Sequence, residues 1–386
     1  MVRLIELRPE LPQRGPPPLR AGRIDRLAPR RGRGALLRIE RKAREVPGLM
    51  LKLARRLARI AALATVVVVI GVRPATAQEL ASWNDGPARH DIEGFVTAVT
   101  TPGPDFVPPE RRIAVFDNDG TLWTKQPIYT EVAFSLARAA QMARADPKLA
   151  AQPAFKAVLS GDRKAIAALS EKDLLQLMVT THSGVSTETF QDAARAWLAQ
   201  ARDPRFHRRY DANVYQPMLE LMAYLRAHGF NVFIVSGGDA DFMRTFAQQV
   251  YGVPPDQVIG SSSQTRFERQ NGRWVLVRQP QMTLDDKAAK PSNIALHIGV
   301  RPIFAAGNSD GDLQMLQYTT SGAGRRMGLI VHHDDAVREY AYDRASKVGT
   351  LDKALDEAAR SGWTVVSMKT DWRIVFPAAL TQSSAR

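Results

Sequence analysis

Two carboxylates, Asp117 and Asp119, stand two residues apart and directly before Gly120. Carboxylates at this spacing can lie beside one metal ion and divide labour, because one attacks an electrophile while the other gives and later takes a proton. Gly120 permits a sharp turn that a side chain would strain. Because the apolar run 113–116 precedes the pair, the pattern indicates a reactive loop after a buried strand and not a solvated acidic turn.

A small anion cradle is predicted at Ser236, Gly237 and Gly238, which follow the apolar run 231–235. The hydroxyl and the exposed backbone N–H groups would point at one place. Further along, Lys290 stands beside Pro291 at the start of a predicted helix, where it can neutralise a phosphate and orient a nucleophile.

A last polar cluster follows the apolar run 302–306 and contains Asn308, Asp310 and Asp312. Oxygen ligands from this cluster and from the Asp117 loop can complete an octahedral Mg²⁺ site. The sequence leaves open which of the three residues binds the metal directly. It also leaves open whether Lys290 or Lys287 is the lysine of the site.

Strands alternating with helices must position these clusters, which predicts an α/β fold with a parallel sheet covered by helices on both faces. In such a sheet the loops at the carboxyl ends of the strands converge on one crevice. The predicted strands are 113–116, 231–235, 257–261, 302–306, 328–332 and 363–368, with a hairpin of 265–268 and 274–278 around Asn271-Gly272. The helices outside 129–209 are predicted at 92–99, 218–228, 241–251, 291–298, 336–345 and 351–361.

Residues 129–209 carry helical patterns and no strand signal, which predicts an all-helical insertion. Its helices are expected at 129–143, 154–159, 162–169, 172–179 and 187–202, the last with Thr187 as N-cap. The core is then expected to comprise residues 78–128 and 210–386. Thr180 to Ser183 of the insertion, and Tyr129 at its start, are candidates to meet a substrate.

The net charge of +14 is concentrated at the N-terminus. Residues 1–77 hold eighteen Lys and Arg against five Asp and Glu, so that +13 of the +14 lies there. The remaining body is nearly neutral and has no broad field for steering nucleic acid. The chain has no cysteine, which excludes disulfides, thiolate metal sites and cysteine nucleophiles.

Residues 50–77 have the pattern of a signal peptide, with a basic start, an apolar run 60–72 and small residues before Gln78. Export to the periplasm or medium is therefore expected, with an uncleaved membrane anchor through 60–72 as the alternative. Residues 1–49 are rich in Arg, Pro and Gly, which predicts either an upstream extension before a start at Met50 or a disordered basic arm.

In this order and context, the four clusters resemble the four motifs of the haloacid dehalogenase superfamily, and most closely those of its phosphoserine-phosphatase-like hydrolases. The similarity spans about residues 111 to 335. It implies a Rossmann-like core with a helical type-one cap inserted between the first two motifs, which matches the place of 129–209. The implied activity is Mg²⁺-dependent hydrolysis of a small phosphorylated metabolite.

The resemblance also implies a role for each matching residue. Asp117 would form an aspartyl-phosphate, and Asp119 would protonate the leaving alcohol and bind Mg²⁺ through its carbonyl. Ser236, with Gly237, and Lys290 would hold the phosphate. Asn308 and Asp312 match the metal motif, but that motif usually begins Gly-Asp, and the neutral Asn308 predicts weaker metal binding.

Two other functions remain open from the sequence: a phosphotransferase with the same aspartyl intermediate, and an exported binding protein that kept the fold without catalysis. The intact acids and Lys290 count against the second. The sequence names neither the substrate nor the oligomeric state.

Overall fold

The structure, a computed structural model, describes residues 79–378, apart from the side chains of Arg163 and Glu171. The expected N-terminal extension, signal peptide and alternative anchor lie outside the described residues. Within residues 79–378, no helix is long and apolar enough to cross a membrane.

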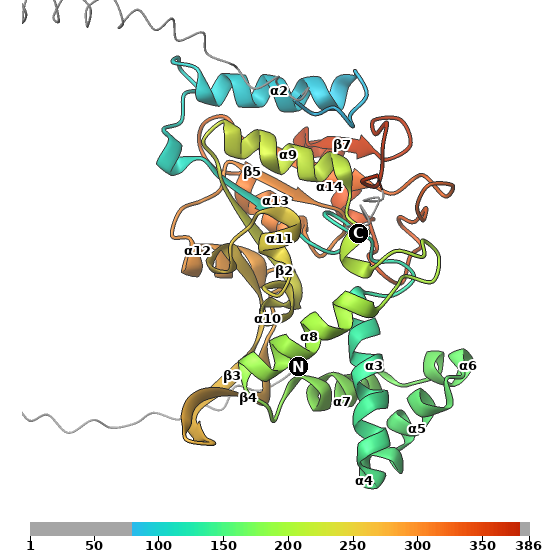
Figure 1. Cartoon of the computed structure of the whole chain (residues 1–386). Coiled ribbons are helices and arrows are strands. Elements are labelled where there is room, and N and C mark those ends of the chain that lie inside the picture. The colour runs from blue at the N-terminus through green and yellow to red at the C-terminus, as the bar shows by residue number, and fades with distance from the viewer. Residues whose placement is uncertain (1–78, 379–386) are drawn as a thin grey trace, which may run out of the picture. The chain divides into compact units, whose positions relative to one another are not determined.

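A sheet forms the centre of the described residues (Figure 1). It has seven strands in the order β4-β3-β2-β1-β5-β6-β7. All neighbouring pairs are parallel except β3 and β4, which form an antiparallel hairpin. This confirms the predicted α/β fold. The strands are β1 (Ile113–Phe116), β2 (Asn231–Asp239), β3 (Val258–Gln270), β4 (Arg273–Thr283), β5 (Phe304–Gly307), β6 (Met327–His332) and β7 (Thr364–Ser367).

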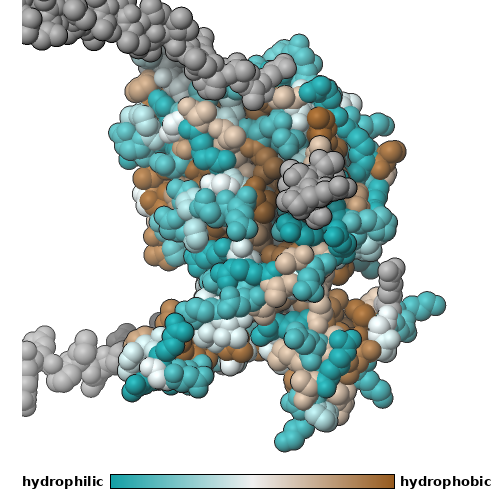
Figure 2. Space-filling view, viewed as in Figure 1, coloured by the Kyte–Doolittle hydropathy of each residue, from teal (hydrophilic) through white to brown (hydrophobic). Residues whose placement is uncertain are grey.

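Helices cover both faces of the sheet, so the central strands are buried on both sides. The first face packs against α2 (Pro87–Thr100), α9 (Gln216–Ala227), α10 (Ala240–Met243) and α11 (Ala247–Tyr251). The second packs against α12 (Ala289–His297), α13 (Leu313–Thr320) and α14 (Lys353–Ser361). On the outside, the face in view carries many hydrophilic residues with apolar ones scattered among them (Figure 2).

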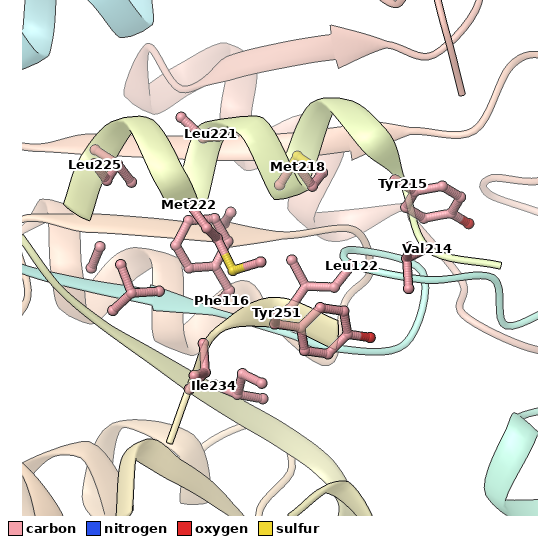
Figure 3. Packing of buried hydrophobic residues seen from close by; sticks show 14 of the residues in the cluster. Phe116, Leu122, Val214, Tyr215, Met218, Leu221, Met222, Leu225, Ile234 and Tyr251 are labelled. Atoms are coloured by element: carbon pink, nitrogen blue, oxygen red, sulfur yellow. The ribbon is translucent and has the colours of Figure 1, made fainter. Parts of the chain in front are cut away.

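Alternate residues of strand β1 belong to two apolar clusters, one on each face of the sheet. Ala114 and Phe116 belong to the apolar cluster on the first face, whereas Ile113 and Val115 belong to the cluster on the second. Met218 and Met222 of α9 point toward the first face, where Phe116 lies (Figure 3). The strand is thus held rigidly from both sides, and its carboxyl end places Asp117.

Six helices lie between β1 and α9, where the sequence predicts a helical insertion (Figure 1). They are α3 (Thr130–Ala145), α4 (Pro147–Ala150), α5 (Pro153–Ser160), α6 (Arg163–Ala167), α7 (Glu171–His182) and α8 (Thr187–Gln200). The predicted N-cap of α8 is wrong by one residue. Ser186, not Thr187, accepts a hydrogen bond from the Thr189 N–H with its side chain.

The β3–β4 hairpin turns at Asn271-Gly272, as the sequence predicts, with both residues at positive φ. The two short strands expected at 257–261 and 265–268 are instead one continuous strand, β3, with a register shift between Ser263 and Thr265. The hairpin reaches the inserted helices, where the Gly184 N–H, between α7 and α8, donates to the Arg278 carbonyl at 2.9 Å. It therefore joins the sheet to the inserted helices.

Two helix predictions fail in detail. Residues 336–345 form turns and not a helix, because His333 and Tyr342 pair as an isolated bridge and stack with ring centroids 4.3 Å apart. The expected helix 241–251 is broken into α10 and α11. At the break, Phe246 leaves helical geometry and stacks on Trp123 at 4.6 Å. In both places aromatic packing overrides local helix propensity.

Candidate active site

The carboxyl ends of β1, β2 and β5 and the first turn of α12 meet at one cavity of about 330 Å³. Five predicted side chains line it: Asp117, Asp119, Ser236, Lys290 and Asp312. Four of the five lie near or just after the carboxyl ends of the adjacent parallel strands β2, β1 and β5, which is why residues so distant in sequence come together.

Asp117 is held by an ammonium group. Lys290 Nζ donates to Asp117 Oδ1 at 2.7 Å and to Asp312 Oδ1 at 2.6 Å, and all three side chains are buried. Burial, reinforced by the nearby Asp312, raises the pKa of Asp117 to about 6. Burial alone would lower the pKa of Lys290, but the two carboxylates raise it above its ordinary value, so Lys290 stays charged.

Asp119 lies in a different environment two residues later. Its Oδ1 accepts a hydrogen bond of 2.8 Å from the Trp123 indole N–H. Burial, followed by the charge of Asp117, raises the pKa of Asp119 to about 7. One acid of the pair is thus bound to a cation and the other is disposed to carry a proton near neutral pH.

The loop that carries the two acids is fixed at Gly120. Its φ is +84°, and a Cβ there would lie 2.2 Å from Asn308 Nδ2. His333 Nε2 donates to the Gly120 carbonyl at 2.7 Å, while His333 Nδ1 lies 3.0 Å from Glu339 Oε2. His333 therefore supports the loop. Residues 79–378 contain no cluster of three or more His, Cys, Asp or Glu side chains placed to hold a metal ion.

The predicted anion cradle lies on an irregular strand end. Strand β2 continues past Val235 to Asp239, and its register against β3 shifts between Ser236 and Asp239, around Gly237 and Gly238. Gly238 N–H donates to Ser236 Oγ at 3.2 Å. A Cβ on Gly238 would lie 3.1 Å from Glu131 Oε2 and 3.6 Å from Asp119 Oδ2, so glycine lets the backbone approach both acids.

The structure distinguishes between the candidate lysines and between the candidate acids that the sequence leaves open. Lys290 contacts Asp117, whereas Lys287 is exposed and does not line the cavity. Asp312 faces the site, whereas Asp310 Oδ1 accepts from the backbone N–H groups of Asp352 and Ala354 at the start of α14. Asp310 therefore has a structural role at a helix start.

Sequence reasoning missed Lys125, which lies eight residues after Asp117. Its side chain is buried, it lines the cavity, and its Nζ donates to Asn308 Oδ1 at 3.0 Å. Burial lowers its pKa, while the carboxylates of Asp117, Asp312 and Asp119 act in the opposite direction. An isolated lysine after Trp123 and Thr124 gives no local signal, because its place depends on residues distant in sequence.

The inserted helices supply the far wall of the cavity through Tyr129 near the start of α3, Glu131 and Val132 on α3, and Met178 on α7. Of the suggested segment 180–183, His182 does not line the cavity. Its Nε2 lies 3.1 Å from Glu131 Oε1, and Glu131 Oε2 accepts from the Asp239 N–H at 2.9 Å. His182 thus positions Glu131, and Asp286 is a further wall residue that the sequence did not single out.

The residues predicted to bind Mg²⁺ were Asp117, Asp119, Asn308 and Asp312. Asn308 Oδ1 already accepts from Lys125, and Asp312 Oδ2 accepts from the N–H groups of Asn308 and Ser309 at 2.9 and 3.1 Å. The remaining oxygen of Asp312 and one of Asp117 accept from Lys290. One oxygen of Asp117, the amide oxygen of Asn308 and both oxygens of Asp312 therefore already accept hydrogen bonds, so as arranged these side chains do not offer Mg²⁺ the free oxygens that it needs.

Several solved structures are similar to this chain at low identity. A functionally unknown protein from Anaerococcus prevotii is 16% identical, with a TM-score of 0.46, over 72% of this chain and 90% of that one. A protein of unknown function from Bordetella pertussis is 15% identical (TM-score 0.41; 66% and 98%). A phosphoserine phosphohydrolase-like protein from Francisella tularensis is also 15% identical (TM-score 0.34; 64% and 98%).

No curated protein matches the chain. The family model described as haloacid dehalogenase-like hydrolase matches residues 114–317, just over half of the sequence. The match begins in β1, ends in α13 and includes all the acids and lysines of the site. The chain belongs to the family of haloacid dehalogenase-like hydrolases.

Proposed function

We propose that this protein hydrolyses phosphate monoesters of small metabolites through a covalent aspartyl-phosphate on Asp117. The observation that supports the proposal most strongly is that two acids of one loop, Asp117 and Asp119, have different environments. Asp117 is bound by the Lys290 ammonium at 2.7 Å, while Asp119, two residues away, has a pKa raised to about 7. A nucleophile and a proton carrier side by side are what a two-step transfer of a phosphoryl group requires.

In the first step, a carboxylate oxygen of Asp117 attacks phosphorus and the bond from phosphorus to the leaving oxygen breaks. Asp119 gives its proton to that oxygen, so an alcohol departs. In the second step, Asp119 takes a proton from a water molecule whose oxygen attacks the same phosphorus. Asp117 is released as a carboxylate together with inorganic phosphate, and Asp119 is again protonated.

Cations and donors must offset the negative charge of the phosphate before a carboxylate can approach it. Lys290 and Lys125 both line the cavity, as do Ser236 and the backbone of Gly237 and Gly238. These groups would hold the phosphoryl oxygens while Asp117 attacks. The size of the cavity, about 330 Å³, suits a small phosphorylated molecule.

The Mg²⁺ dependence that the sequence predicts is not part of this proposal. Since the oxygens of Asn308 and Asp312 accept hydrogen bonds from ammonium and N–H groups, neither step above is assigned to a metal ion. Both steps are written with the side chains that line the cavity alone.

The test is turnover of p-nitrophenyl phosphate and of a panel of phosphorylated metabolites by the purified full-length protein. The proposal predicts phosphate release by the wild type and a loss of at least about 10⁴-fold in Asp117→Asn, because a removed nucleophile leaves only residual catalysis. Asp310→Asn, at a carboxylate outside the cavity, is the matched control and should retain turnover. Turnover that survives Asp117→Asn would remove the proposed nucleophile, and no turnover on any substrate would favour a binding protein.

A further inference from the structure

The Lys125 side chain lies against two glycines: Gly120, inside the matched family region, and Gly349, beyond its end. A Cβ on Gly120 would lie 2.8 Å from Lys125 Cε. A Cβ on Gly349 would lie 2.0 Å from Cε and 2.3 Å from Nζ. Both glycines have positive φ, at +84° and +69°. Because neither glycine has a side chain, there is room for Lys125, and a Cβ at either position would collide with it.

The ammonium is directed at the position where the site departs from its usual pattern. Its hydrogen bond ends on Asn308 Oδ1, the oxygen that the motif would offer to a metal ion if residue 308 were the usual aspartate. Asn308 is completely buried, and Thr121 Oγ1 lies 3.5 Å from the same oxygen. The neutral side chain at residue 308, where the motif usually has an aspartate, therefore lies beside the positive charge of Lys125.

The charges around the cavity agree with this pairing. Asp117, Asp119 and Asp312 face two ammonium groups, Lys125 and Lys290. A Mg²⁺ ion bound between Asp117 and Asn308 would have to displace the Lys125 ammonium from Asn308 Oδ1 or lie beside it. Like charges in a buried site repel strongly because little water screens them.

We propose that the Lys125 ammonium takes the place of the metal ion, so that the site works with a fixed organic cation and without Mg²⁺. Resting on the proposed hydrolysis, this assigns Lys125 to neutralise a phosphoryl oxygen, a task in which lysine acts as a compact point charge. Lys290 then orients Asp117, while Lys125 supplies the second cation.

Metal binding tests the proposal without reference to activity. Mn²⁺, a paramagnetic substitute for Mg²⁺, is titrated into the full-length protein and followed by electron paramagnetic resonance. Wild type should show no Mn²⁺ binding that depends on Asp117. The double variant Lys125→Met with Asn308→Asp removes the ammonium and places the usual carboxylate at residue 308. It should therefore bind about one equivalent of Mn²⁺. Adding Asp117→Asn to the double variant should abolish this binding.

Turnover gives the second measurement. Treatment of the wild type with EDTA, or addition of Mg²⁺, should change phosphate release by less than about twofold, whereas Lys125→Met should lower it about 100-fold, as for other removed donors to an oxyanion. Lys287→Met, at an exposed lysine outside the cavity, should stay within about twofold of wild type. Mg²⁺ should stimulate the double variant and not the wild type.

Two results would overturn the proposal. One is a wild-type protein that binds an equivalent of Mn²⁺ and loses it in Asp117→Asn. The other is wild-type turnover that EDTA abolishes and Mg²⁺ restores. The titration of the wild type needs no variant to fold, and it decides the question even if the protein hydrolyses no phosphate ester, so failure of this inference is distinguishable from failure of the proposed function.

Discussion

The proposed mechanism gives Asp117 and Asp119 different functions because their surroundings differ. Asp117 is bound by a cation, whereas Asp119 accepts one neutral hydrogen bond from Trp123 and lies near the negative charge of Asp117. Attack requires ionised Asp117, and departure of the alcohol requires protonated Asp119. The fraction with both in the right state is largest between their pKa values.

This difference predicts a bell-shaped pH profile. As pH rises through about 6, Asp117 loses its proton and kcat/KM for an alkyl phosphate should increase. As pH rises further through about 7, Asp119 loses its proton and kcat/KM should fall. The profile is measured with an alkyl phosphate because such a substrate needs a protonated leaving group. In Asp119→Asn the alkaline fall should vanish, and a fall that persists in this variant would assign it to another group.

The sequence predicted the residues that follow strands and missed those whose place depends on distant partners. Asp117, Ser236 and Asp312 come together because adjacent parallel strands end at one edge of the sheet. Lys125 reaches the cavity only because Gly349 leaves room for it and Asn308 accepts its hydrogen bond. Neither condition is visible in the segment around Lys125.

At the scale of elements, the β3–β4 hairpin connects the sheet to the inserted helices through Arg278. The Arg278 side chain is fully buried, and its guanidinium binds Asp239 at the end of β2 and Asp241 on α10. Arg278 Nε also donates to the His182 carbonyl of α7 at 2.7 Å. One side chain therefore joins the hairpin, the end of β2 and the inserted helix α7.

Replacement of this arginine should be strongly destabilising. Arg278→Met leaves Asp239 and Asp241 without their buried cation, which should lower the free energy of unfolding by about 3–5 kcal/mol, measured by urea denaturation. Arg266→Met on the same hairpin is the control. Arg266 pairs with Glu268, but its side chain is 66% exposed, so its loss should be below about 1 kcal/mol. Equal effects of the two substitutions would contradict the proposed link.

Elements with strong local signals were predicted well, and those decided by packing were not. β1 is found at the predicted residues, and Asn271-Gly272 forms the predicted turn. Residues 336–345 have helical periodicity but form turns, because His333 pairs with Tyr342 and Arg338 donates to carbonyls near Trp372. Such contacts arise only after the chain has folded.

At the scale of the whole molecule, the described segments near the two chain ends pack against each other. The Trp83 and Trp372 rings meet edge to face with centroids 6.1 Å apart, and Asn84 N–H donates to the Asp371 carbonyl at 2.8 Å. Both tryptophans are buried. Trp83 and Asn84, a few residues after the predicted mature start at Gln78, thus already belong to the folded body.

We propose export with removal of residues 50–77, because a basic start, a short apolar run and small residues precede Gln78. Mass spectrometry of the protein from native extract should find Gln78 at its N-terminus. A form that retains residues 60–72 would support the uncleaved anchor, and peptides from residues 1–49 would contradict a start at Met50.

The central claim, a covalent intermediate on Asp117, is tested most directly by trapping it. The full-length protein is quenched with acid during turnover of a phosphate ester and reduced with borohydride, which converts an aspartyl-phosphate side chain to that of homoserine. Mass spectrometry of the peptide carrying residue 117 should show this conversion in the wild type only when substrate is present. Reduction at a different residue, or an unmodified Asp117 in protein that was turning over, would contradict the account.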